Sequence, residues 1–261
     1  MRLGKYLRRS AVCVALLLAT GAARAADLIV GANVGNVPWE FQDETGKFVG
    51  FEVELVQKAT EAMGMTPRFE NIPFNGLFPA VQSKRIAAAI SSITITPTRL
   101  QSLSFTQPYY DSDQSLAVSA RSGLANLTAM KGKAVGVDTA STGDQWATAN
   151  QAKYGFADIK RYEGLAPAML DLQAGRIEGY ISDIPAVQYY IRDKAQFRVA
   201  ERIPTGERYG VMFAKGSPLA AQFDAEITKM KQSGFLAALH QKWFGAAADA
   251  GSSTVAVLPM P

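Results

Sequence analysis

Short apolar runs and longer stretches with helical spacing alternate along most of the chain. Residues 28–32 and 86–91 are small or apolar throughout, as expected of strands that are covered on both faces. Residues 50–64 instead repeat apolar side chains at the spacing of a helix. This alternation predicts an α/β protein, built from parallel sheets that are flanked by helices.

The alternating pattern occurs twice, over residues 26–115 and again over residues 120–203. Two further strand-like segments, 116–119 and 208–213, stand at the two ends of the second unit. If the second unit is inserted into the first, these segments are the two strands that cross between lobes. The predicted organisation has three parts. The first lobe is discontinuous and comprises residues 26–115 plus 208–245, and the second lobe, which includes the hinge strands, comprises residues 116–207. Residues 246–261, which are small and polar, form a flexible tail.

The first 25 residues have the composition of an export signal rather than of a folded domain. Four basic residues near the N-terminus precede an apolar run at 11–19, and Ala23-Arg24-Ala25 supplies the small residues that signal peptidases recognise. The apolar run is about half of the ~20 residues that a membrane span requires. The sequence therefore predicts a cleavable signal peptide at residues 1–25 and secretion of the rest.

Removal of the signal changes the charge of the protein. The whole chain has 27 Lys and Arg residues against 23 Asp and Glu residues, but five of the basic residues and none of the acidic ones lie in residues 1–25. The remaining chain is close to neutral, which argues against nucleic-acid binding. The only cysteine, Cys13, lies in the signal, and the single histidine, His240, cannot supply a catalytic triad or a transition-metal site. The sequence thus predicts neither an enzyme nor a cofactor or metal.

A first group of polar residues follows a predicted strand of the first unit. Ser91, Ser92 and Thr94 lie between that strand and a predicted helix, where hydroxyl and backbone N–H groups can bind an anion. Arg99 lies one turn into the helix, and its planar guanidinium suits a carboxylate bidentately. Helix capping by Thr96 and a surface position for Arg99 would explain the same residues.

Two further polar groups follow strands of the second unit. Asp138 and Thr142 lie at a strand-to-helix turn, where hydroxyl and helix N–H groups would face the same ligand from the opposite side. Asp183 follows the strand at 177–181, where a carboxylate can hold an ammonium group. Helix capping is the alternative explanation for both groups. If the lobes meet, Arg99 and Asp183 would clamp a zwitterion through its α-carboxylate and its α-ammonium group.

Six short segments occur in an order that is specific for a known family. They span nearly all of residues 28–245 and are residues 38–41 (PWEF), 46–55 (GKFVGFEVEL), 93–99 (ITITPTR), 104–110 (SFTQPYY), 132–137 (GKAVGV) and 242–245 (KWFG). Through these segments the chain resembles the extracellular solute-binding proteins of family 3, the polar amino-acid receptors of bacterial ABC importers. The resemblance implies a type II periplasmic-binding fold, with two lobes joined by two crossover strands, that closes like a hinge.

The resemblance also implies roles for individual residues. Arg99 falls at the family's carboxylate-binding arginine, and Asp183 falls at its ammonium-binding aspartate. Ser92 and Thr94 align with backbone and hydroxyl contacts to the ligand, and Thr142 aligns with the carboxylate contact of the second lobe.

Four more positions are expected near the side chain of the ligand. Phe74 falls at an aromatic wall of the family's cleft. Asn33 stands where some receptors for basic amino acids carry an acid, and Asn36 stands where many members carry a stacking aromatic. Asp138 falls at a variable position that faces the ligand side chain, where it would favour a cationic group, while the two asparagines suit a polar neutral one. No basic residue is found there, which disfavours aspartate and glutamate as ligands.

The resemblance therefore predicts a periplasmic, monomeric receptor that needs no cofactor and binds a free polar or basic L-amino acid between its lobes. Its partners would be the permease and ATPase subunits of an ABC importer at the inner membrane. Two alternatives stay open. Periplasmic cyclohexadienyl dehydratases, which act on prephenate or arogenate, use the same fold, and a sensor that presents its ligand to a membrane receptor would use the same cleft.

Overall fold

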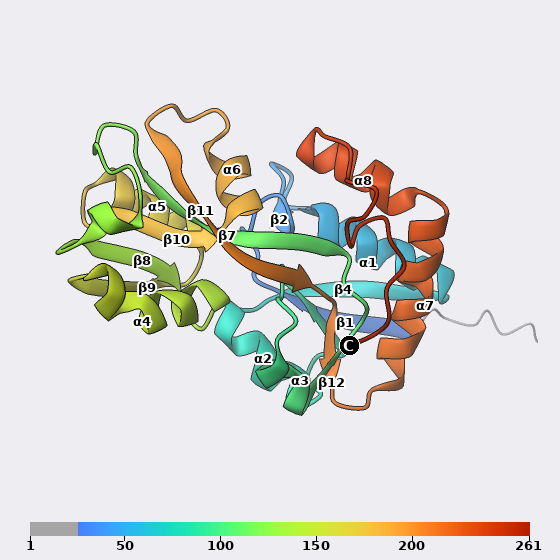
Figure 1. Ribbon diagram of the computed structural model, residues 1–261. Coiled ribbons are helices and arrows are strands. Elements are labelled where there is room, and N and C mark those ends of the chain that lie inside the picture. The colour runs from blue at the N-terminus through green and yellow to red at the C-terminus, as the bar shows by residue number, and fades with distance from the viewer. Residues whose placement is uncertain (1–25) are drawn as a thin grey trace, which may run out of the picture.

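The computed structural model describes residues 26–261 (Figure 1). The predicted signal peptide at residues 1–25 lies outside the described residues. The described residues form two α/β lobes, each built around a five-stranded sheet. Among their helices, none combines the length and the apolar character that a bilayer span requires.

Lobe 1 contains β1 (Ala26–Ala32), β2 (Phe41–Gln42), β3 (Phe48–Val49), α1 (Phe51–Ala62), β4 (Met65–Asn71), α2 (Phe74–Gln82), β5 (Ala88–Ile90), α3 (Pro97–Ser102), β6 (Leu103–Phe105), β12 (Met212–Ala214), α7 (Pro218–Gln232) and α8 (Phe235–Phe244). The strand order of its sheet is β4-β1-β5-β12-β6. β1 pairs in parallel with β4 and β5, as strand–helix alternation predicts, whereas β12 runs antiparallel to β5 and β6.

Lobe 2 contains β7 (Tyr110–Ser119), the 3₁₀ helix η1 (Leu127–Met130), β8 (Ala134–Asp138), α4 (Thr142–Tyr154), β9 (Asp158–Tyr162), α5 (Leu165–Gln173), β10 (Gly179–Asp183), α6 (Ile184–Ile191) and β11 (Phe197–Tyr209). The strand order of its sheet is β11-β7-β10-β8-β9. β9, β8 and β10 are parallel, and β7 pairs antiparallel with both β10 and β11.

The two lobes are joined by β7 and β11. The chain passes from β6 of the first sheet to β7 of the second and returns from β11 to β12, so two paired strands cross between the lobes (Figure 1). Both strands are longer than the sequence predicts, because β7 already begins at Tyr110 and β11 at Phe197. The polar stretch 111–115 concealed the start of β7. Four of its five residues are buried, and Asp113 accepts two backbone N–H groups from β11.

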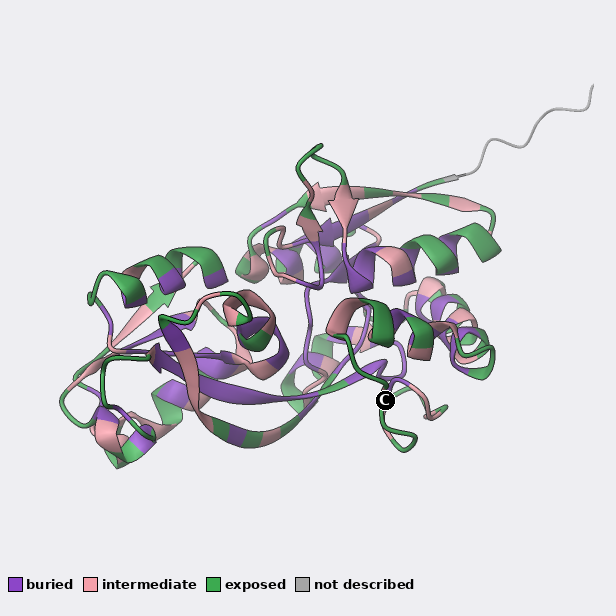
Figure 2. Ribbon diagram, turned by 90° about the horizontal axis from the view of Figure 1, so that it is seen from above, coloured by how far each residue is buried: buried purple, intermediate pink, exposed green. Residues whose placement is uncertain are grey.

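An aromatic cluster packs where the crossing strands enter lobe 1. Trp39 is fully buried, and its ring centroid lies 4.6 to 5.5 Å from those of Phe51, Tyr110, Tyr209 and Phe244. These rings belong to α1, β7, β11 and α8, so the cluster ties both crossing strands to the helices of lobe 1. Figure 2 shows buried residues along the sheets and on the inward sides of the helices. The strand ends between the lobes are therefore supported from both sides by packed cores.

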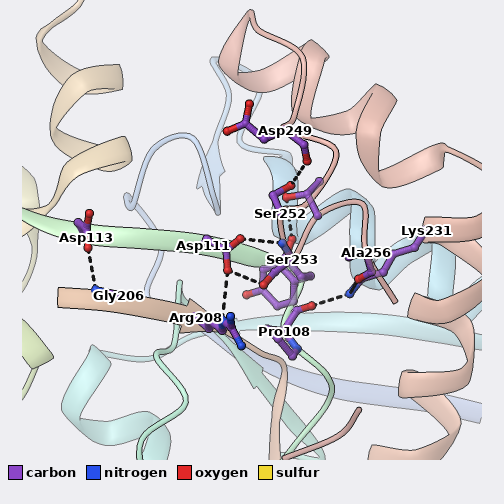
Figure 3. Close-up of polar contacts among 12 residues, drawn as sticks. Pro108, Asp111, Asp113, Gly206, Arg208, Lys231, Asp249, Ser252, Ser253 and Ala256 are labelled. Carbon is purple, nitrogen blue, oxygen red and sulfur yellow. Dashed lines mark hydrogen bonds and ion pairs between the residues drawn. The ribbon is translucent and has the colours of Figure 1, made fainter. Parts of the chain in front are cut away.

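The structure differs from the expected flexible tail, because the C-terminal segment is docked beside the crossing strands (Figure 3). The buried Ser253 donates its backbone N–H to Asp111 of β7 at 2.6 Å and its hydroxyl to the same carboxylate. Asp111 also pairs with Arg208 of β11 at 3.4 Å. The ammonium group of Lys231 on α7 donates to the carbonyl of Ala256 at 2.9 Å. Composition could not predict this docking, since residues distant in sequence supply the partners.

Deletion of residues 249–261 from a protein that begins at residue 26 is expected to lower its melting temperature by several degrees. Each intramolecular hydrogen bond that is lost contributes about 1 kcal/mol, and about 1 kcal/mol corresponds to roughly 2–4 °C in a domain of this size. Differential scanning calorimetry measures the change. Deletion of residues 259–261 alone, which make none of the contacts above, is the matched control. Equal melting temperatures of the longer deletion and the wild type would contradict the docking.

Candidate functional site

A cavity of about 100 Å³ lies between the two lobes. Nine of the ten predicted site residues line it: Asn33, Asn36, Phe74, Ser91, Ser92, Thr94, Asp138, Thr142 and Asp183. Most of them follow a parallel strand or begin a helix, because the loops at the C-terminal ends of parallel strands converge on one edge of each sheet. The two edges face each other across the cavity, so one ligand there would contact both lobes.

The cleft between the lobes is closed. The hydroxyl of Ser92 in lobe 1 donates to Asp183 Oδ2 in lobe 2 at 3.2 Å, and the hydroxyl oxygens of Thr94 and Thr142 lie 3.4 Å apart. Gly164 also comes close to lobe 1 and has a φ of +128°, a conformation that glycine adopts without steric cost. A ligand in this cavity would thus be enclosed by polar groups from both sides.

Arg99, the tenth predicted residue, lies beside the cavity and is only 8% exposed. Its Nη1 donates to the carbonyl of Thr94 at 2.7 Å, and its guanidinium lies over the rings of Phe78 and Phe74 at 4.9 and 5.6 Å. Burial lowers the pKa of Arg99 to about 10, partly offset by nearby carboxylates, so the group stays charged at neutral pH. Its buried Nη2 finds no acceptor among residues 26–261, which leaves the two N–H groups of this atom for a ligand. Thr96 does cap α3, but Arg99 is not a surface charge.

Asp183 ends β10 and stands at the N-cap position of α6. Its side chain makes no capping hydrogen bond and instead accepts Gln114 Nε2 at 2.5 Å and the hydroxyl of Ser92 at 3.2 Å. Burial, and then the charge of Glu207, raise the pKa of Asp183 to about 7. A cationic group in the cavity would lower this pKa again and bind the ionised carboxylate.

The turn after β5 is held by two buried glutamates that the sequence analysis did not identify. Ser92 has a φ of 44°, and both oxygens of Glu52 accept its backbone N–H at 2.9 and 3.1 Å. The hydroxyl of Ser91 donates to Glu40 at 2.6 Å, and Asn36 donates to Glu40 at 3.2 Å and to the hydroxyl of Ser92 at 3.1 Å. Burial and the charge of Glu52 raise the pKa of Glu40 well above its usual range, which favours the protonated form of Glu40. Ser91 and Asn36 thus support the wall of the cavity.

Two residues of the crossing strands were also missed by the sequence analysis. Gln114 of β7 lines the cavity and donates to Asp183, as described above. Glu207 of β11 is 7% exposed and accepts the hydroxyls of Thr94 at 2.9 Å and Thr142 at 3.1 Å. The signal that would have identified both residues is the presence of polar residues next to the apolar segments that were predicted to cross between the lobes.

Two further acidic residues of lobe 2, Asp138 and Glu163, line the cavity. Asp138 ends β8, and its Oδ2 accepts the hydroxyls of Tyr180 at 2.7 Å and Ser182 at 3.3 Å. Its buried Oδ1 finds no donor among the described residues. Burial raises the pKa of Asp138 to about 6, and the exposed Glu163 nearby adds to the rise. A donor or cation on the ligand would satisfy Asp138.

His240 lies outside the cavity, where its ring stacks on Tyr110 and its Nδ1 contacts the carbonyl of Ala246 at 2.8 Å. Within residues 26–261 there is no group of three or more His, Cys, Asp or Glu side chains arranged for a metal ion. The cavity can therefore bind a ligand through hydrogen bonds and through opposite charges. Arg99 supplies the positive charge, and Asp138 and Asp183 supply carboxylates.

Comparison with known proteins gives a consistent result. The sequence profile of the bacterial extracellular solute-binding proteins, family 3, matches residues 28–246. The L-cystine-binding protein TcyJ of Escherichia coli is 30% identical, over 84% of this chain and 83% of the relative. The L-arginine-binding protein of Pseudomonas aeruginosa is 29% identical, over 82% of this chain and 86% of the relative.

Solved structures show the same fold. The structure of an ancestral arginine-binding protein bound to arginine superposes with a TM-score of 0.80 and 29% identity, over 85% of this chain and 100% of that protein. The arginine-, lysine-, histidine-binding protein ArtJ of Geobacillus stearothermophilus has a TM-score of 0.78 and 31% identity, with 86% and 97% coverage. The structure therefore has the type II periplasmic-binding-protein fold, and the docked C-terminal segment lies beyond the family match.

Proposed function

Because the chain belongs to the bacterial extracellular solute-binding proteins, family 3, we propose that it captures a free L-amino acid between its lobes and presents it to the permease and ATPase subunits of an ABC importer. In this proposal the protein works in the periplasm as a monomer. Relatives named for the binding of arginine and cystine support the amino-acid class. The relatives and structures described above are binding proteins, so the dehydratase alternative is not favoured.

The proposal depends chiefly on one observation, which is the pair of opposite charges that the two lobes bring to one closed cavity. Lobe 1 supplies Arg99, whose Nη2 lacks an acceptor among the described residues. Lobe 2 supplies Asp183, whose carboxylate faces the same cavity. The α-carboxylate of an amino acid would pair with Arg99 and its α-ammonium group with Asp183. These charge-assisted hydrogen bonds form only when the lobes are together.

The acidic residues of lobe 2 that line the cavity support a cationic side chain on the ligand, with a polar neutral one as the alternative. Asp138 Oδ1 is a buried acceptor without a donor among the described residues, and Glu163 also lines the cavity. Among residues 26–261, the side chains that line the cavity include neither lysine nor arginine. An acidic ligand side chain would meet only like charge there, whereas a guanidinium or ammonium group would pair with Asp138.

Titration calorimetry with a panel of amino acids tests the proposed function. We expect at least one of L-arginine, L-lysine, L-ornithine, L-glutamine and L-cystine to bind with a Kd of about 10 μM or less, or roughly −7 kcal/mol. L-glutamate should bind far more weakly. Incubation with prephenate should yield no product absorbance. Failure of every amino acid in the panel would overturn the proposal.

Replacement of Asp138 by asparagine is expected to weaken binding of a cationic amino acid about tenfold or more, because one charge-assisted bond contributes about 1.5–3 kcal/mol. The affinity for L-glutamine should change much less, because an amide can pair with asparagine. Calorimetry with L-arginine and L-glutamine measures both effects, and Asp158→Asn, at an exposed position of the same lobe, is the control. An equal loss for both ligands would show that Asp138 does not recognise charge.

A further inference from the structure

Glu207 gathers hydrogen-bond donors from both lobes and from the hinge. Its Oε2 accepts the hydroxyl of Thr94 from lobe 1 at 2.9 Å and that of Thr142 from lobe 2 at 3.1 Å. Gln114 Nε2, on the neighbouring crossing strand, lies 3.1 Å from each of its carboxylate oxygens. Glu207 does not line the cavity itself, yet it contacts three residues that do.

These contacts determine whether the two threonine hydroxyls act as donors or as acceptors towards the cavity. A hydroxyl group has one proton and two lone pairs. Since Glu207 accepts the protons of Thr94 and Thr142, the oxygens of these residues can offer only lone pairs to the cavity that they line. Together with the carboxylate of Asp183, they form a surface of acceptors, which matches the three N–H donors of an ammonium group and repels a carboxylate.

Donors for a carboxylate come from other atoms nearby. Arg99 Nη2 is buried without an acceptor among the described residues. The backbone N–H groups of Thr142 and Gly143 stand in the first turn of α4, where a helix offers no acceptor of its own and favours an anion. The two α-groups of an amino acid would therefore meet separate sets of partners. The α-ammonium group would meet hydrogen-bond acceptors, and the α-carboxylate would meet donors.

We propose that Glu207 is a positioning residue that makes the α-amino end of the cavity an acceptor site, by holding the hydroxyl protons of Thr94 and Thr142 away from the ligand. This inference rests on the proposed function. It has a consequence for closure, because the two hydroxyls belong to different lobes and both reach one oxygen only when the lobes are together. Recognition of the ammonium group is thus completed by closure of the cleft.

The replacement Glu207→Gln tests the proposal with three probes, measured by titration calorimetry. L-Arginine carries both α-groups, agmatine lacks the carboxylate, and 5-guanidinopentanoate lacks the ammonium group. The glutamine amide is neutral and offers one acceptor oxygen in place of two, so it holds the hydroxyl protons of Thr94 and Thr142 more weakly and leaves them free to turn towards the ligand ammonium group. We expect arginine and agmatine to lose about 10- to 100-fold in affinity, the range of one charge-assisted bond, and 5-guanidinopentanoate to change less than about threefold.

Matched variants separate this role from a structural one. Glu201→Gln, on the same strand but bonded to the backbone of Leu127, should leave all three affinities unchanged. If Glu207→Gln fails to fold, Thr142→Val should show the same selective loss, and Thr142→Ser should restore the affinity. If the wild type binds L-glutamine rather than L-arginine, the comparison is made between L-glutamine and its desamino analogue glutaramate.

Two outcomes would overturn the role of Glu207 and are distinguishable from each other. If the wild type binds amino acids but Glu207→Gln weakens the amino acid and its desamino analogue equally, or weakens neither, Glu207 does not determine polarity and the proposed function stands. If the wild type binds no amino acid of the panel, the proposed function fails and the role of Glu207 fails with it.

Discussion

Replacement of Arg99 by alanine is expected to raise the Kd for the bound amino acid by roughly a hundred- to a few thousandfold. Arg99 is 8% exposed, and its Nη2 lacks an acceptor among the described residues, so a ligand carboxylate would complete a buried charge pair. Removal of one partner from such a pair costs about 3 to 5 kcal/mol, because the other charge stays buried and unpaired. Each 1.4 kcal/mol changes Kd about tenfold. Calorimetry with L-arginine and L-glutamine measures the loss.

Three controls make this result specific for the carboxylate. Arg99→Lys keeps the charge but loses the planar fork, so it cannot donate to the carbonyl of Thr94 and to the ligand in the same way, and an intermediate loss is expected. Arg85→Ala removes an exposed arginine of the same lobe, which pairs with Glu70 at the surface, and should have no effect. Agmatine, which lacks the carboxylate, should bind the wild type and Arg99→Ala equally. An unchanged Kd for amino acids in Arg99→Ala would disprove the clamp.

Replacement of Asp183 by asparagine is expected to weaken amino-acid binding about a hundredfold at pH 7.5 and to remove a pH dependence of the wild type. Burial, and then the charge of Glu207, raise the pKa of Asp183 to about 7, so this carboxyl is protonated in the free protein at acid pH. A ligand with an α-ammonium group binds the ionised form, so binding releases the proton. The affinity of the wild type should be highest above about pH 7 and fall by up to about tenfold per pH unit below it.

Proton release provides a direct measurement of this linkage. Calorimetry at pH 6 in buffers of different ionisation enthalpy should show about one proton released on binding to the wild type, and fewer for Asp183→Asn. Burial also raises the pKa of Asp138, to about 6, so a cationic ligand should lose further affinity below that pH. Asp138→Asn is therefore the control, since it should keep the transition near pH 7. The same pH profile in Asp183→Asn and the wild type would exclude Asp183 as the ammonium partner.

Local periodicity was sufficient to predict much of the fold. Residues 28–32, 50–64 and 86–91 correspond closely to β1, α1 and β5. Strand and helix patterns depend on neighbours within a few residues, so they are visible in a single sequence. The same reasoning placed seven candidate residues at strand ends, and six of them line one cavity. The other three lining candidates, Asn33, Asn36 and Phe74, came from the family resemblance.

The crossing strands were predicted less well, and with them two residues beside the cavity. β7 begins with polar residues, which are typical of a loop in sequence but are buried in the structure. Burial of polar groups is possible there because partners from β11 and lobe 2 satisfy them, as Thr205 and Asp183 do for Gln114. The polar residues beside the predicted crossing segments are a local sign of Gln114 and Glu207, but the contacts of these two residues depend on the tertiary structure.

The sequence by itself determined the strands, the helices and the polar residues at their ends, because short-range periodicity and turn chemistry produce them. It left a surface position as the alternative to ligand binding for Arg99, and helix capping as the alternative for Asp183. Only the tertiary structure decided between them, by burying Arg99 against Phe78 and by leaving Asp183 without a capping bond. It likewise decided that the C-terminal segment is docked and that Glu207 joins both lobes. The physical reason is the same in each case, since these contacts join residues far apart in sequence and form only when two separately packed lobes meet across a shared hinge.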